Sequence, residues 1–308
     1  MKRPEVTKYK DITDDWLRVE APAKINLMLS VHGRREDGFH ELTSMVAALD
    51  FGDELELRIN ACESDSLESD GVTVPLDESN LVLRAARLFR ERSGRGECFD
   101  FRLRKRIPVG AGLGGGSSDA VAALKGMDAL LGTRMSREEL WALAATLGSD
   151  CPFFVEATPA VMSGRGEILE AVDPQVAARL AGQRVVLFRP SFAIDTGWAY
   201  GRLVARPQYY EEKTVAEARI AAFSAGGNWQ EFMQNAFEEV VGEKFLALPC
   251  LLEKLRAKGS FCMMSGSGSA CFALVANDDE AAALSATCRK AWGEGIFWVE
   301  TSIVEGIM

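Results

Sequence analysis

Residues 107–126 read IPVGAGLGGGSSDAVAALKG, and five of the seven positions from 110 to 116 are glycine. Two serines and an aspartate follow, and a run typical of a helix comes after them. Glycines before a helix N-terminus favour an anion site, because backbone N–H groups point into the loop and no Cβ atom blocks close approach. The stretch therefore predicts a loop that holds phosphate or pyrophosphate. A hinge or tight turn would be the better interpretation of a lone glycine pair, but not of five glycines followed by Ser-Ser.

The residues around the glycines distinguish between two common phosphate loops. A Walker A loop needs Gly-Lys-Ser or Gly-Lys-Thr, which the sequence lacks. The dinucleotide fingerprint is formally met by GAGLGG (110–115), but the helix expected after the loop runs into a second helix, SREELWALAATLG (136–148). A parallel strand should begin there in a dinucleotide fold. Dinucleotide binding is therefore the poorer interpretation.

Composition and charge exclude several classes of protein. The chain has 308 residues, 47% of them hydrophobic, and a formal net charge of −10, which argues against a nucleic-acid surface. No apolar run approaches the roughly 20 residues that span a bilayer, and the first residues lack a signal-peptide pattern, so we expect a cytoplasmic protein with no membrane partner. The seven cysteines form no Cys-x-x-Cys pair and there are only two histidines, so neither a zinc site nor a disulfide framework is expected.

Alternating apolar residues predict a strand before the loop. In residues 18–32, RVEAPAKINLMLSVH, every second residue from Val19 to Val31 is apolar, so Lys24 and Asn26 share the opposite, polar face. We expect this face to point away from the core.

The rest of the chain mixes strands and helices. Ser117 or Ser118 is expected to cap a helix that ends near Gly132, and Ser-Arg-Glu-Glu (136–139) is a capping box. Further strands are expected at 53–59, 98–105, 184–190 and 296–304, and further helices at 80–92, 136–148, 214–223, 228–240, 250–258 and 278–292. Because the elements do not alternate regularly, we predict two α+β domains, residues 1–170 and 171–308.

Five motifs together resemble one superfamily. The loop PVGAGLGGGSSDA is similar to the second motif of the GHMP kinases, which are ATP-dependent kinases of small molecules. The other matching stretches are PAKINL (22–27), GRREDGFHEL (33–42), LGSDCPFF (147–154) and MSGSGSACF (264–272). Their order and spacing resemble the branch that phosphorylates a cytidine diphosphate sugar alcohol in the non-mevalonate isoprenoid pathway. The likeness runs from about residue 18 to the end of the chain.

The resemblance implies a fold and ligands. The N-terminal domain is expected to be similar to the second domain of ribosomal protein S5 and the C-terminal domain to be ferredoxin-like, with the active site in the cleft between them. ATP is the implied phosphoryl donor, and Mg²⁺ would neutralise its β- and γ-oxygens. No side chain is assigned to the metal, and we expect a monomer or a weak homodimer.

The resemblance also implies roles for three residues at the reacting centre. Asp150 is the expected base for the acceptor hydroxyl, and Lys24 is the lysine beside it that keeps the carboxylate ionised. Asn26 would orient the acceptor. Taken alone, an aspartate before Cys-Pro is more often a turn residue.

The remaining implied site residues bind the two substrates. Phe39 would stack on cytosine, although the family usually has tyrosine there, and His40 would hydrogen-bond to the base. Thr196 and Tyr200 match a substrate-contacting threonine and a second stacking ring. The ATP loop comprises Pro108, Val109, Gly110, Ala111, Gly112, Leu113, Gly114, Gly115, Gly116, Ser117 and Ser118. The segment NAFEEVV (235–241) departs from the family pattern and receives no role.

Two rival functions are also compatible with the amino-acid sequence. One is a GHMP kinase acting on another alcohol, such as mevalonate, homoserine or a sugar. The other is a nucleotide-binding protein of the same fold without turnover. GRREDGFHEL disfavours the first, and the presence of both Lys24 and Asp150 disfavours the second.

Overall fold

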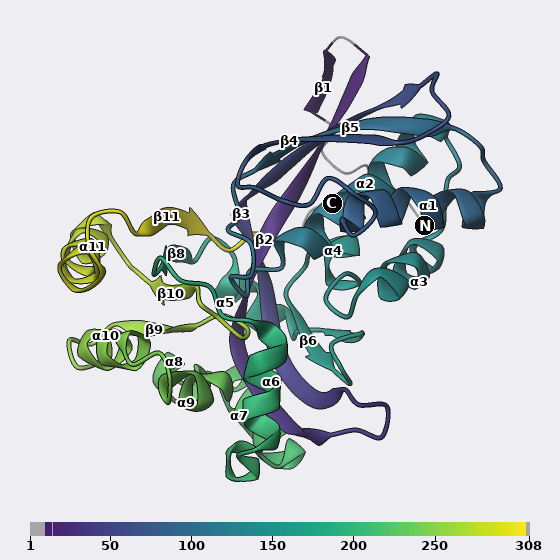
Figure 1. Ribbon diagram of the computed structural model, residues 1–308. Helices are drawn as coiled ribbons and strands as arrows, with labels where there is room; N and C mark the ends of the chain where they lie inside the picture. The colour runs from purple at the N-terminus through teal and green to yellow at the C-terminus, as the bar shows by residue number, and fades with distance from the viewer. Residues whose placement is uncertain (1–9, 14, 306–308) are drawn as a thin grey trace.

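The N-terminal half is built on one large, mostly antiparallel sheet. The computed structural model describes residues 10–13 and 15–305. Seven strands pair in the order β1-β2-β3-β5-β4, with β6 added beside β3 and β7 beside β6. Their bounds are β1 Lys10–Thr13, β2 Trp16–Arg34, β3 His40–Asn60, β4 Ser66–Gly71, β5 Cys98–Lys105, β6 Ala160–Ser163 and β7 Ile168–Ala171. Helices α1 (Leu81–Ser93), α2 (Gly115–Leu131), α3 (Arg137–Leu147) and α4 (Phe153–Glu156) lie together on the same side of this sheet (Figure 1).

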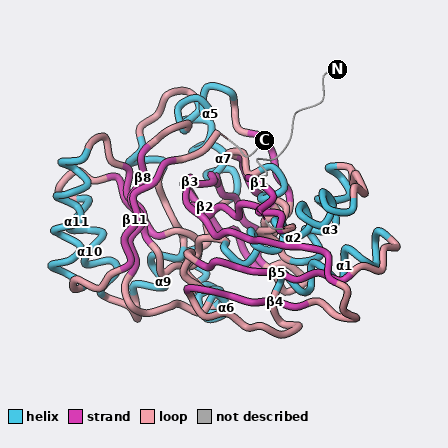
Figure 2. Tube along the Cα trace, turned by 90° about the horizontal axis from the view of Figure 1, so that it is seen from above, coloured by secondary structure: helices cyan, strands magenta, loops and turns pink. Residues whose placement is uncertain are grey.

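The C-terminal half has a second sheet of four antiparallel strands. Their order is β11-β8-β10-β9, the ferredoxin-like arrangement expected from the sequence. The strands are β8 (Arg184–Arg189), β9 (Phe261–Met264), β10 (Cys271–Leu274) and β11 (Phe297–Ser302). The helices are α5 (Pro174–Leu180), α6 (Thr196–Val204), α7 (Lys213–Ser224), α8 (Trp229–Phe232), α9 (Phe237–Gly242), α10 (Ala247–Arg256) and α11 (Asp278–Trp292), with a 3₁₀ turn at Pro207–Tyr209. In Figure 2, α10 and α11 lie beside one another along the outer face of this sheet. The boundary at residue 170 stays a prediction.

The long ribbon of β2 and β3 runs through both halves (Figure 1). Its register shifts between Pro22 and Lys24 and again between Asn26 and Met28, which marks bulges. In this stretch, Ala23, Ile25 and Leu27 belong to one core together with residues of the C-terminal sheet, whereas apolar residues before and after them on β2 belong to a second core that contains residues of both the N-terminal helices and the C-terminal half.

The sequence predicts that Lys24 and Asn26 share one face of β2 and that this face points away from the core. The second part of this prediction is wrong. Both residues are buried, with 4% and 5% of their surface exposed. They are covered because the glycine loop and the turn between β9 and β10 close over the other face of β2 at this point. Alternation identified which residues share a face, but not what covers it.

Two helix predictions need correction. Helix α2 begins at Gly115 with Gly114 as its N-cap, so neither Ser117 nor Ser118 caps it. The predicted helix 228–240 is two short helices, α8 and α9, separated at Asn235, whose side chain bonds to the neighbouring turn. The capping box at Ser136 and the helix end at Gly148 are confirmed.

Candidate active site

A cleft of about 760 Å³ opens between the two halves of the molecule. That volume suits a site for organic ligands. Its lining from the N-terminal half includes Lys24, Asn26, Phe39, His40, Asp150 and the loop from Pro108 to Ser117. Its lining from the C-terminal half comprises Thr196, Gly197, Tyr200, Phe237, Gly266 and Ser267. The structure therefore brings the predicted site residues together, except Ser118, which is buried behind the loop with no partner for its hydroxyl group.

Two loop glycines are required by contacts within the protein itself. Gly112 and Gly114 have φ angles of 76° and 72°, in the left-handed region. A Cβ atom on Gly112 would lie 2.1 Å from the carbonyl oxygen of Ser265, and one on Gly114 would lie 2.7 Å from Cζ of Phe154. The loop is thus pressed against the rest of the chain on one side.

Other loop glycines differ in what surrounds them. A Cβ atom on Gly115 would lie 2.8 Å from Nζ of Lys105, which sits directly under the loop. One on Gly110 would meet nothing within 4 Å, and one on Gly116 only Leu81 at 3.7 Å. The open space at these two positions leaves room for a ligand beside the backbone.

The residues predicted to react form a connected group beside the loop. Nζ of Lys24 lies 3.4 Å from Oδ2 of Asp150 and donates a hydrogen bond of 2.6 Å to Oδ1 of Asn26. The Asn26 amide donates in turn to the hydroxyl of Ser44 at 2.9 Å. The lysine is buried, whereas the Asp150 side chain is 42% exposed. A buried cation therefore faces a carboxylate that reaches into the cleft.

An aromatic group lies at one end of the cleft. Phe39 is 47% exposed, and the guanidinium carbon of Arg165 lies 4.8 Å from the centre of its ring. The rings of His40 and Tyr200 pack with centroids 4.7 Å apart. Nε2 of His40 is buried and has no hydrogen-bond partner. Burial, and then the charge of Arg34, lower the pKa of His40, so the imidazole is neutral near pH 7 with one nitrogen unused.

Tyr200 connects this aromatic end to the reacting group. Burial raises the pKa of its phenol, and the nearby carboxylate of Asp150 raises it further. The phenol therefore stays protonated, and its interaction with Asp150 shows that the aromatic end of the cleft adjoins the reacting group.

The turn between β9 and β10 closes the cleft from the C-terminal side. The hydroxyl of Ser265 donates to the carbonyl of Gly112 at 2.9 Å, and the hydroxyl groups of Thr196 and Ser267 lie 2.9 Å apart. The amide of Asn235 donates to the carbonyls of Met264 and Gly266, both at 2.8 Å. The segment 235–241, for which the sequence analysis predicts no role, thus holds this second glycine turn.

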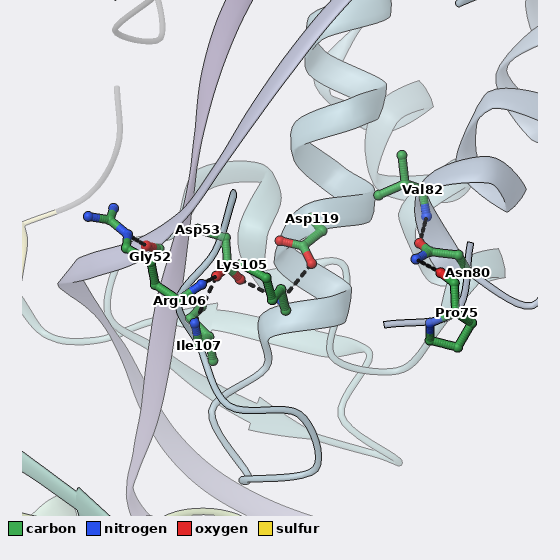
Figure 3. A network of polar contacts seen from close by, with 9 residues as sticks. All are labelled: Gly52, Asp53, Pro75, Asn80, Val82, Lys105, Arg106, Ile107 and Asp119. Carbon is green, nitrogen blue, oxygen red and sulfur yellow. Dashed lines mark hydrogen bonds and ion pairs between the residues drawn. The ribbon is translucent and has the colours of Figure 1, made fainter. Parts of the chain in front are cut away.

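The opposite end of the cleft was missed by sequence reasoning. It is lined by Val74, Pro75, Asn80 and Leu81, which lie beside the predicted loop residue Val109. Asn80 caps α1 by accepting from the backbone of Val82 at 2.9 Å and donating to the carbonyl of Pro75 at 2.7 Å (Figure 3). Asparagine before an apolar run is a helix-start signal, and nothing in the pattern showed that this helix start borders the cleft.

A buried group of charges under the loop was also missed. Lys105, the last residue of β5, donates from Nζ to Asp53 at 2.5 Å and to Asp119 at 2.6 Å (Figure 3). The other oxygen of Asp53 accepts from the backbone of Arg106 and Ile107 at 2.6 and 2.8 Å. We call Asp53, Lys105 and Asp119 the buried triad.

Within the described residues, no helix is both long and apolar enough to cross a membrane. The same residues contain no cluster of three or more histidine, cysteine or acidic side chains suited to a metal.

Family models match both halves of the chain. The model of the GHMP kinases N terminal domain matches residues 80–157, which include the glycine loop and Asp150. The model of the GHMP kinases C terminal domain matches residues 213–294, which include the second glycine turn. The class defined by the fold and the cleft is therefore the GHMP kinases, enzymes that phosphorylate small molecules.

Curated relatives narrow the class. The chain is 36% identical over 278 residues to 4-diphosphocytidyl-2-C-methyl-D-erythritol kinase of Methylacidiphilum infernorum, covering 87% of this chain and 89% of the relative. It is 38% identical to the enzyme of the same name from Synechococcus sp., covering 90% and 95%. The chain belongs to the 4-diphosphocytidyl-2-C-methyl-D-erythritol kinase family.

Solved structures agree with this assignment. A crystal structure of 4-(cytidine 5'-diphospho)-2C-methyl-D-erythritol kinase superposes with a TM-score of 0.74 at 35% identity, covering 92% of this chain and 99% of the other. Homoserine kinase from Cytophaga hutchinsonii gives a TM-score of 0.73 at 20% identity and shares the fold. The resemblance inferred from the motifs and the predicted fold class are confirmed.

Proposed function

We propose that this kinase transfers the γ-phosphoryl group of ATP to the 2-hydroxyl of 4-diphosphocytidyl-2-C-methyl-D-erythritol, a step of the non-mevalonate isoprenoid pathway. The observation that carries the proposal is the position of the Lys24–Asp150 pair. It lies beside the glycine loop, with an aromatic pocket on one side. The family assignment supplies the name of the acceptor.

In this mechanism the side chains position the reactants and stabilise charge. Asp150 accepts the proton of the acceptor hydroxyl, and its exposure to the cleft lets that hydroxyl approach. The ammonium group of Lys24 favours the ionised carboxylate and offsets charge on the transferring phosphoryl group. Asn26 fixes the lysine through its hydrogen bond of 2.6 Å.

The acceptor end supports recognition of a cytosine ring. Phe39 and Tyr200 offer aromatic faces for stacking, and the unused Nε2 of His40 can bond to a polar edge of the base. Replacing the family's usual tyrosine by Phe39 keeps the face and omits one hydroxyl. Arg165, whose guanidinium lies over the Phe39 ring, places a positive charge at this end of the cleft, which suits an anionic acceptor.

The other end of the cleft suits the purine of ATP. Val74, Pro75 and Leu81 provide apolar contacts, and Gly110 and Gly116 leave space beside the loop backbone for phosphates. ATP would then lie along the loop with its γ-phosphate near Asp150.

The phosphate oxygens of ATP are suitable ligands for a Mg²⁺ ion that enters the site together with ATP. Mg²⁺ keeps several waters and binds substrate phosphates more readily than protein cages. Phosphate oxygens and water would therefore supply most of its ligands. The bound ion would neutralise charge on the β- and γ-phosphates. The cytoplasmic location and the monomeric or weakly dimeric state stay predictions.

The test is release of ADP from ATP with a panel of acceptors. The cytidine diphosphate methylerythritol, mevalonate, homoserine and galactose are compared at equal concentration. We expect turnover with the first alone. Turnover with another acceptor instead would replace the proposed substrate, and absence of turnover with all four would favour a non-catalytic nucleotide-binding role.

A further inference from the structure

The buried triad places an uneven set of charges under the glycine loop. One ammonium group and two carboxylates leave a net charge of −1 when all three are ionised. A Cβ atom added to Gly115 would touch Nζ of Lys105, so the ammonium group of the triad lies immediately behind the loop backbone, with both carboxylates bonded to it. ATP is a polyanion, and a negative charge behind its binding loop opposes its binding.

The hydrogen bonds of the two carboxylates are unequal. Asp53 accepts from Lys105, Arg106 and Ile107, so its charge is compensated on both oxygens. Asp119 accepts from Lys105 through Oδ2 only, and its Oδ1 is buried without a partner. A buried carboxylate with one bare oxygen is costly in its ionised form. Asp119 is therefore the member of the triad suited to carry a proton.

We propose that ATP binds to the form of the enzyme in which Asp119 is protonated, so that the neutral triad supports the phosphate loop. At alkaline pH, where Asp119 is ionised before ATP binds, the binding of each ATP is coupled to the uptake of one proton from the solvent, which forms the O–H group of Asp119. Asp119 acts as a positioning residue through Lys105 and the loop. The inference rests on the proposed role of the glycine loop as the ATP site.

The surroundings of Asp119 set the pH range of the effect. Burial raises its pKa to about 8; the ammonium of Lys105 lowers the pKa and the carboxylate of Asp53 raises it. These two residues are the charged groups that face Asp119 from β5 and β3. Bound ATP favours the protonated form further. Affinity should therefore be highest below about pH 8 and fall as the pH rises through that value, by up to about tenfold per unit.

The test measures binding of ATP alone by calorimetry from about pH 7.5 to about pH 9.5, above the ionisation of the ATP phosphates. Each pH is repeated in two buffers with different heats of ionisation, which counts the protons taken up. For the wild type we expect ATP affinity to fall roughly tenfold or more over this range, with proton uptake approaching one per ATP. Asp119→Asn should bind ATP with little dependence on pH.

Two variants separate Asp119 from other groups. Lys125 lies further along α2, and burial lowers its pKa to about 8, so it titrates in the same range. Lys125→Met should keep the wild-type pH dependence, and so should Asp100→Asn, which alters a partly buried carboxylate on β5 that is paired with Arg58.

The outcomes distinguish this inference from the function it rests on. Affinity independent of pH in the wild type, without proton uptake, overturns the inference and leaves the ATP site intact. The wild-type slope in Asp119→Asn, or its loss in Lys125→Met, also overturns it. No ATP binding at any pH would overturn the role of the loop as well. If Asp119→Asn does not fold, the proton count of the wild type decides.

Discussion

Substitution of Asp150 by asparagine removes the proposed base while keeping the shape of the side chain. A positioned base contributes about 10²- to 10⁴-fold to the rate, so kcat should fall by this factor, which corresponds to roughly 3–5 kcal/mol of transition-state stabilisation. The lower end applies if the transition state is loose and needs little help from a base. Ligand affinities should change little.

Stability should also change little in this variant. The Asp150 side chain is 42% exposed, and the buried ammonium of Lys24 keeps its hydrogen bond to Asn26. Because the carboxylate of the pair is open to water, its contribution is closer to that of a surface pair, about 0–1 kcal/mol, than to that of a fully buried one. The assay is steady-state ADP release together with thermal unfolding. Asp128→Asn is the control, since Asp128 holds a turn by accepting from Thr133. If Asp150→Asn keeps half of the wild-type activity, Asp150 is a turn residue and not the base.

Two further substitutions test the ends of the cleft. Gly115→Val should weaken ATP binding strongly and leave acceptor binding nearly intact, because the new side chain would displace Lys105 from under the loop. The control is Gly96→Val, since Gly96 has open space around it. Unchanged ATP affinity in a folded Gly115→Val protein would refute the reasoning. Phe39→Ala or His40→Ala should raise the acceptor KM by roughly tenfold or more and leave the ATP KM almost unchanged, whereas Phe39→Tyr should be mild. Free CMP or CDP should compete with the acceptor; failure to compete, with an unchanged KM in Phe39→Ala, would contradict a cytosine site.

Local signals in the sequence predicted the longest described helices, α1, α2, α3, α7, α10 and α11, and the strands β2, β5, β8 and β11, but not short strands such as β4, β6, β9 and β10. The alternation in residues 98–105 matches β5, and the acidic start and basic end of residues 278–292 match α11. Asn80 caps α1, and the capping box at Ser136 is present in full. These features are set by residues within a few positions of one another, which is why the pattern alone predicts them.

Features that depend on distant contacts could not be predicted. Gly114 caps α2 because Phe154 and Lys24 crowd the loop, and no local pattern reports that crowding. The helix predicted over 228–240 breaks because Asn235 bonds across to residues 264 and 266. The buried triad joins three residues from two strands and a helix, each of which looks like an ordinary surface charge in the sequence.

The long ribbon of β2 and β3 has a consequence for how the chain unfolds. Its middle residues, Ala23, Ile25 and Leu27, belong to the same core as Val185 and Phe272 of the C-terminal sheet. A chain cut near residue 170 would therefore leave each half with apolar surface that its own residues do not cover. The two halves should therefore unfold in a single cooperative transition. A substitution that destabilises one half should lower the stability of the other half as well.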